Sequence, residues 1–123
     1  MMVVSPGFLQ YLQTHFTGAA EERLHATYCD DYGRYLHDEI LAAGSADFVA
    51  TRARALFGRA LALGAGGLLL AHNHPSGQCR PSQQDIAATN RMRDIALALD
   101  IVLLDHLIIT RTQIYSIRRG GCL

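Results

Sequence analysis

The chain has 123 residues, and its 11 Lys+Arg residues balance its 11 Asp+Glu residues, so the formal net charge is zero. This length fits one domain, and a hydrophobic fraction of 50% supplies enough apolar side chains for a core, which excludes a disordered chain. The neutral balance argues against a strongly basic nucleic-acid binder.

The first half of the chain predicts a helix followed by a β-hairpin. Apolar residues recur at helical spacing over residues 6–16, after the typical helix start Ser5-Pro6. Residues 22–29 and 34–42 are strand-like, and the turn-forming residues 30–33 join them.

The second half predicts helices that alternate with strands. An amphipathic helix ends at Gly64, and the apolar run of residues 67–71 indicates a buried central strand. A further helix begins near Pro81 and extends to about Leu99. The apolar stripe of the first of these helices consists of Val49, Ala53, Leu56, Phe57, Ala60 and Leu61. The stripe of the second consists of Ile86, Met92, Ile95 and Leu99. Three strand-like segments follow, at residues 101–104, 106–110 and 113–117. This order favours an α/β (α+β) domain with a mixed β-sheet sandwiched by helices.

Three side chains near the end of the predicted central strand could bind a metal ion. His72 and His74 are two residues apart, and in extended backbone such side chains point to the same side. Asp85 lies one turn into the next helix, after a loop that can fold it back toward the imidazoles. Two histidines and a carboxylate, with one position left for water, are typical of a catalytic zinc site.

Ordinary structural roles also account for these residues. A single His-x-His is usually a pair of polar residues at a strand end. Ser82 and Asp85 have the spacing of a capping box, with Ser82 as the N-cap and Asp85 as the third helical residue. A hydroxyl that caps the helix would be only partly available for catalysis.

The four residues together form one pattern: His72-x-His74, then seven residues, then Ser82-x-x-Asp85. This pattern resembles the signature of the JAB/MPN (JAMM) metalloprotease superfamily. The words His-Asn-His-Pro-Ser-Gly at 72–77 and Leu-Asp-His-Leu-Ile-Ile at 104–109 are similar to its RadC branch in particular. The resemblance implies a JAB/MPN (cytidine-deaminase-like) architecture.

The resemblance covers residues 21–119. It leaves residues 1–20 as an N-terminal helix and lead-in, and residues 120–123 as a frayed tail. RadC proteins usually carry an N-terminal region of helix-hairpin-helix character, so this chain resembles a stand-alone RadC-type domain without it.

The same resemblance implies one Zn²⁺ per chain, held by His72, His74 and Asp85, and a peptidase or isopeptidase reaction. A Glu upstream would accept a proton from the attacking water and donate it to the leaving amine. Glu22 fits that place best, and Glu21 is the alternative. Ser82 would hydrogen-bond the oxyanion of the tetrahedral intermediate. The loop is shaped by Asn73 (as a turn former), Pro75, Ser76 and Gly77.

Two further residues have an open role. His106 could approach the site as a group that supports a metal ligand, or it could be a satisfied core histidine. Cys79 lies in the loop between His74 and Ser82, where it could be a redox-active or inhibitory ligand or an ordinary loop thiol.

The remaining expectations concern location and partners. The longest apolar run, residues 60–71, is shorter than the roughly 20 residues of a membrane span. Cys29, Cys79 and Cys122 are an odd, scattered set rather than a disulfide framework, which predicts a reducing, cytoplasmic location.

The substrate is a peptide or protein that the sequence does not identify. Two alternatives to the enzyme are a DNA-repair-associated accessory module with a structural or vestigial metal, and a metal-free partner domain. Relatives of this fold often pair through helices, so a homodimer is also expected.

Overall fold

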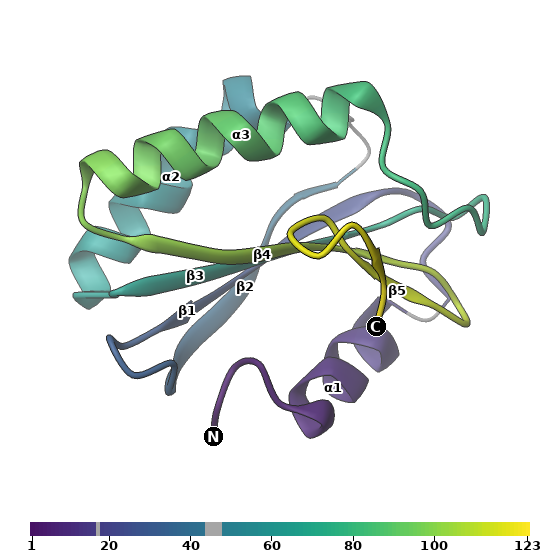
Figure 1. The fold of residues 1–123 in the computed structure, drawn as a ribbon, viewed down its shortest axis with the longest axis horizontal. Coiled ribbons are helices and arrows are strands. Elements are labelled where there is room, and N and C mark those ends of the chain that lie inside the picture. Colours follow the sequence, from purple (N-terminus) through teal and green to yellow (C-terminus); the bar gives the residue numbers. More distant parts are fainter. Residues whose placement is uncertain (17, 44–47) are drawn as a thin grey trace.

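The computed structural model describes residues 1–16, 18–43 and 48–123, and Figure 1 shows their arrangement. The chain begins with a helix at the N-terminus and ends with short strands at the C-terminus. The elements are α1 (Pro6–Phe16), β1 (Arg23–Cys29), β2 (Tyr35–Ala43), α2 (Phe48–Leu63), β3 (Gly67–Asn73), α3 (Gln83–Ala98), β4 (Val102–Ile109), β5 (Ile114–Ser116) and β6 (Gly121–Cys122).

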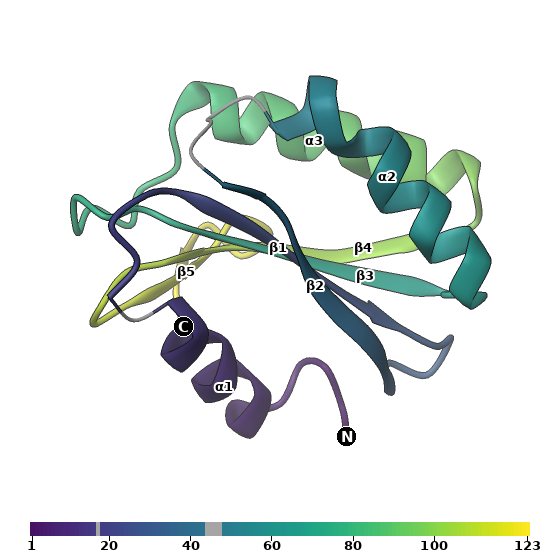
Figure 2. The same ribbon diagram turned by 180° about the vertical axis from the view of Figure 1, so that it is seen from behind.

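One mixed sheet forms the middle layer of the molecule. Its strand order is β2-β1-β3-β4-β5-β6, with β3 and β4 parallel and the other neighbours antiparallel. Helices α2 and α3 cover one face of the sheet and α1 covers the other (Figures 1 and 2). The predicted mixed sheet between helices is therefore confirmed.

The central strand β3 supplies both halves of the core. Successive side chains of a strand point to opposite faces, so Leu68 and Leu70 pack toward α2 and α3. Leu69 and Ala71 belong to the cluster that includes Phe8 and Leu12 of α1. Each residue of β3 is buried, which explains why this strand is continuously apolar until its last residues.

Helix α3 buries only part of the predicted stripe. Met92 is buried and Ile95 packs against the core as predicted, whereas Ile86 is 42% exposed and Leu99 is 37% exposed. The other buried residues of the helix are Thr89 and Ala96. The apolar pattern misled here because the inward face contains a threonine that has a polar partner under the helix. The side chain of Val49, at the start of the predicted α2 stripe, lies outside the described residues.

The C-terminal half of the sheet is more regular than the sequence suggested. Residues 102–109 form one strand, β4, rather than two strand-like segments. The tail expected to be frayed pairs with β5 instead: Cys122 lies opposite Tyr115, and the backbone N–H of Leu123 donates to Ile114 O at 2.9 Å. Backbone hydrogen bonds to β5 thus order this end of the chain.

Within the described residues, no helix is both long and apolar enough to cross a membrane. The cytoplasmic location stays a prediction.

Candidate metal centre

The site lies where β1 begins and β3 ends. These two strands are antiparallel, and Leu24 of β1 is opposite His72 of β3. Glu22, immediately before β1, is therefore brought to the edge of the sheet at which the two site histidines lie. After β3, the chain continues through the loop 74–82 into α3, and the N-terminus of α3 lies at the same edge of the sheet (Figure 1).

His72, His74 and Asp85 bring one ligand atom each to within 4.8 Å of one another. The Nε2 atoms of the two imidazoles are 3.0 Å apart. The carboxylate oxygens of Asp85 lie 3.5 Å from Nε2 of His72 and 3.3 Å from Nε2 of His74. The structure thus brings together the three residues that the spacing singled out as metal ligands.

A chain of hydrogen bonds decides which nitrogen of His72 carries its proton. The hydroxyl of Thr89 donates its one hydrogen to the backbone carbonyl oxygen of Asp85 at 2.7 Å. Its oxygen can then only accept, so Nδ1 of His106, 2.7 Å away, is the donor. Nε2 of a neutral His106 is left as an acceptor, and Nδ1 of His72, 2.7 Å from it, donates to it. Nε2 of His72 therefore presents a lone pair to the site.

The proton of His74 is fixed in a similar way. Its Nδ1 lies 2.7 Å from the backbone carbonyl of Gln78, which can only accept, so Nδ1 is the donor. In the neutral ring, Nε2 again presents a lone pair. Two imidazole lone pairs and a carboxylate that converge in this way repel one another unless a proton or a metal cation lies between them. The donor set fits Zn²⁺, which binds His nitrogen and Asp oxygen.

The charges of the site are consistent with a strong preference for positive charge. Burial alone would raise the pKa of Asp85, but its contacts with His72 and His74 and the Ser82 N–H hold this pKa well below its usual value. The contact with Asp85 raises the pKa of His74 against the opposing effect of burial. His106, which is 5% exposed, has its pKa lowered to about 3, chiefly by burial and then by the proximity of His72. A neutral His106 is what the hydrogen-bond chain requires.

Ser82 caps α3 without losing its hydroxyl hydrogen. Its Oγ accepts from the backbone N–H of Asp85 at 3.0 Å, and its own backbone N–H donates to Oδ2 of Asp85 at 2.9 Å. The predicted capping box is confirmed. An acceptor role engages a lone pair of the hydroxyl oxygen and leaves its hydrogen for another acceptor. The capping role of Ser82 therefore leaves its hydroxyl hydrogen available for an oxyanion, whereas the sequence suggested that the hydroxyl would be only partly available.

Asn73 has a different structural role from the predicted turn former. It is the last residue of β3, it is 4% exposed, and its side chain binds the segment before β1. Its Oδ1 accepts from the backbone N–H of Arg23 at 2.7 Å, and its Nδ2 donates to Glu21 O at 3.1 Å. These two bonds hold the backbone on both sides of Glu22. Asn73 thereby positions the acidic residue rather than the loop after it.

The loop itself is shaped by the three residues that follow His74. The backbone N–H of Gly77 donates to His74 O at 3.0 Å, which closes a turn with Pro75 at its second position. Gly77 has a φ of +90°, which favours glycine, and Ser76 Oγ accepts from Gln78 N at 3.4 Å. This turn places the Gln78 carbonyl against the His74 ring.

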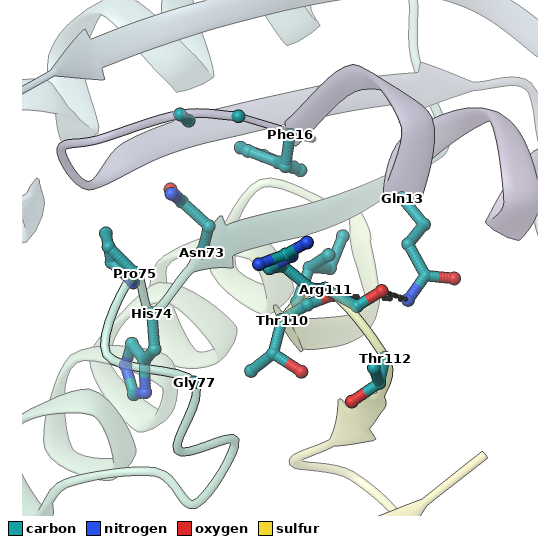
Figure 3. Close-up of a pocket in the computed structure, with 12 residues that line it drawn as sticks. Gln13, Phe16, Asn73, His74, Pro75, Gly77, Thr110, Arg111 and Thr112 are labelled. Carbon is teal, nitrogen blue, oxygen red and sulfur yellow. Dashed lines mark hydrogen bonds between the residues drawn. The ribbon is translucent and has the colours of Figure 1, made fainter.

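Two cavities meet at His74 and Pro75. One, of about 480 Å³, is lined by Glu22, Ser82 and Asp85 together with His74. Glu21 is exposed and does not line it, so the structure favours Glu22 of the two candidate acids. The other, of about 680 Å³, extends toward α1 and the β4–β5 turn. Figure 3 shows His74 and Pro75 along one wall of the larger cavity, with Gln13 and Thr112 across from them.

The structure also places the two residues whose roles the sequence left open. His106 contacts His72 directly, which supports the first of its two predicted roles. Cys79 does not belong to the metal-binding group found among the described residues, and its thiol contacts Gln113 and Cys122 instead. Sequence reasoning missed Thr89. Its position four residues after Asp85, on the same helix face, was a signal that could have found it.

Comparison with known proteins identifies the family of the chain. A family model described as "RadC-like JAB domain" matches residues 5–122. The chain belongs to this family.

A UPF0758 protein of Rhodobacter capsulatus is 40% identical over 115 residues, which are 94% of this chain and 54% of that protein. The UPF0758 protein YkfG of Escherichia coli is 34% identical over 93% of this chain and 72% of its own length. A UPF0758 protein of Paraburkholderia xenovorans is 36% identical over 90% of this chain and 44% of its own length. The RadC-like chain thus spans about half the length of several of its relatives.

Replacing Thr89 by Val should disturb the proton order of the site. The isosteric side chain removes the acceptor for Nδ1 of His106, so His106 and His72 no longer hold a single tautomer. We expect the affinity of the candidate site for added Zn²⁺ to fall about 10- to 100-fold, the loss typical when a group that orients a metal ligand is removed. Long-range ¹H–¹⁵N NMR of the imidazoles reports the tautomers, and competition with a chelator reports the affinity. Thr89→Ser, which keeps the hydroxyl, should preserve both, and equal affinity of the Val variant and the unaltered protein would contradict the assignment.

Replacing Asn73 by Asp should destabilise the start of β1. The carboxylate keeps an acceptor for Arg23 N–H but cannot donate to Glu21 O, and it is buried. We expect the free energy of unfolding to fall by about 1–3 kcal/mol, as when a buried polar group loses its partner. Urea denaturation measures this change. Asn90→Asp, on an exposed position of α3, is the matched control and should change stability by less than about 0.5 kcal/mol.

Proposed function

We propose that this RadC-like domain is a zinc-dependent hydrolase of the peptidase or isopeptidase class. One observation carries the proposal: the lone pairs of His72 and His74 converge on the Asp85 carboxylate in a cavity that Glu22 and Ser82 also line. A metal site, a proton acceptor and a hydroxyl donor in one cavity are the groups that hydrolysis of an amide requires.

Each residue has one role in the proposed reaction. His72, His74 and Asp85 hold the ion, which would polarise a carbonyl and lower the pKa of a water molecule. Glu22, held from both sides by the Asn73 amide, accepts a proton from the attacking water and passes it to the leaving amine. Ser82 directs its hydroxyl hydrogen to the developing oxyanion while its oxygen still caps α3. The larger cavity beside His74 gives room for the substrate chain on one side of the reacting bond.

The relatives leave the substrate and partners open, because half of their length lies outside the matched region. A peptide or protein substrate and a homodimer remain parts of the proposal. The DNA-associated accessory module is the alternative. It predicts DNA affinity that falls steeply with salt, since such binding depends on phosphate contacts.

Zinc content should depend on Asp85. Protein purified without added metal should contain about one zinc per chain, as expected for a site with three protein ligands. Asp85→Ala should contain much less. Asp85→Asn keeps an oxygen for the Ser82 N–H but loses the charge, so it separates metal binding from helix capping and should also lose zinc. Elemental analysis measures the ratio, with Asp94→Ala on the exposed side of α3 as the control. An Asp85→Ala variant with full zinc content would refute the ligand set.

Hydrolysis should depend on Glu22 and not on Glu21. Glu22→Gln removes the proton acceptor but keeps the size of the side chain, so zinc should stay and cleavage of a peptide library should fall by about 100-fold or more. Mass spectrometry of the library reads out the products. Glu21→Gln, one residue earlier and outside the cavity, should cleave like the unaltered protein. A zinc-loaded protein that cleaves no peptide and binds duplex DNA in a salt-dependent manner would favour the accessory module instead.

A further inference from the structure

Two cysteines that are 43 residues apart in the sequence meet beside the site. Cys79 lies in the loop between His74 and Ser82, and Cys122 lies in β6. Their sulfur atoms are 3.8 Å apart. The scattered cysteines of the sequence gave no sign of this pair, because it depends on the pairing of β6 with β5 next to the loop.

Both partners of the pair are held in place by their neighbours. Backbone pairing with Tyr115 fixes Cys122. The thiol of Cys79 donates to Oε1 of Gln113 at 3.1 Å, and the residue before it is bound through its carbonyl to the His74 ring. A disulfide bond is about 2.05 Å long, so the two sulfur atoms need to approach by about 1.8 Å. Side-chain rotation of a partly exposed and an exposed residue can supply a movement of this size.

Exposure separates this pair from the third cysteine. Cys122 is exposed and Cys79 is partly exposed, whereas Cys29 is buried in β1. Burial, together with the nearby Asp30 and Asp31 carboxylates, raises the pKa of the Cys29 thiol to about 11, so Cys29 is a poor nucleophile. A soluble oxidant can therefore reach the pair and not Cys29.

We propose that Cys79 and Cys122 form a reversible disulfide that fastens the site loop to the C-terminal strand. The oxidant is a small-molecule disulfide such as oxidised glutathione. One thiolate of the pair attacks one sulfur of the oxidant and releases one thiol, which gives a mixed disulfide. The other thiolate then attacks the protein sulfur of that mixed disulfide and releases the second thiol. The protein loses two hydrogen atoms and the oxidant becomes two thiols, so the electrons balance.

The bond restrains the residue next to Gln78, whose carbonyl orients His74. Oxidation should therefore order the loop 75–81 and limit the movement of one predicted metal ligand. Formation of the bond does not rest on the proposed hydrolase, because it needs only the two thiols and the oxidant. The consequence for His74 does rest on it.

The test treats the full chain with oxidised glutathione in the presence of a chelator. We expect two of the three thiols to disappear, and peptide mapping without reduction should recover the Cys79–Cys122 cross-link. Hydrogen exchange should become slower in residues 75–81 of the oxidised protein and return to its original rate with a reductant. Cys79→Ser and Cys122→Ser should each abolish the cross-link and the slowing, and Cys29→Ala should retain both.

Several results would overturn the proposal. They are glutathione adducts that never resolve to the cross-link, a cross-link between two chains, or loss of all three thiols at equal rates. Peptide mapping of the unaltered protein identifies the bonded residues directly, so the test does not depend on any variant folding. Loss of zinc binding in Asp85→Ala together with an intact cross-link would separate the fate of this proposal from that of the hydrolase.

Discussion

The hydrogen-bond chain from Asp85 O through Thr89 and His106 to His72 joins α3, β4 and β3 at one point. Each bond in the chain is 2.7 Å long, and each limits the direction of the next, because a hydroxyl has one hydrogen and a neutral imidazole has one donor. The chain therefore sets the tautomer of His72 from the backbone of the helix that also carries Asp85. A single buried threonine links the placement of one ligand to the proton state of another.

The end of β3 serves both faces of the sheet. His72 points toward α3 and the candidate metal site, and Asn73, the next residue, points to the other face, as the alternation of a strand requires. There the Asn73 amide holds the backbone on both sides of Glu22. Adjacent residues of one strand thus position a predicted metal ligand and the predicted proton acceptor. Because the two positions are coupled through the backbone, a change in strand register would displace both at once.

The loop 74–82 is the part of the site without regular secondary structure, and three local contacts hold it. The turn at Pro75–Gly77, the Gln78 carbonyl on His74 and the capping box at Ser82 fix its conformation locally. Cys79 adds a contact to the C-terminal strand. The candidate metal site uses His74 at the start of this loop and Ser82 at its end, whereas the cysteine pair uses Cys79 between them. The proposed chemistry and the proposed redox control therefore rest on different residues of one segment.

The sequence alone determined the central strand, the helix start at Ser82, the three candidate ligands and the membership of the mixed-sheet class. Local rules suffice for these features, since strand alternation, capping and ligand spacing depend on neighbours in the chain. The sequence predicted only part of the buried stripe of α3, because Thr89 faces inward for a polar partner rather than for burial of apolar area. It likewise misassigned Asn73, left His106 open and separated Cys79 from Cys122. Those four features depend on which strands pair and in which register, and only the tertiary structure brings residues so distant in the chain within hydrogen-bond or thiol contact.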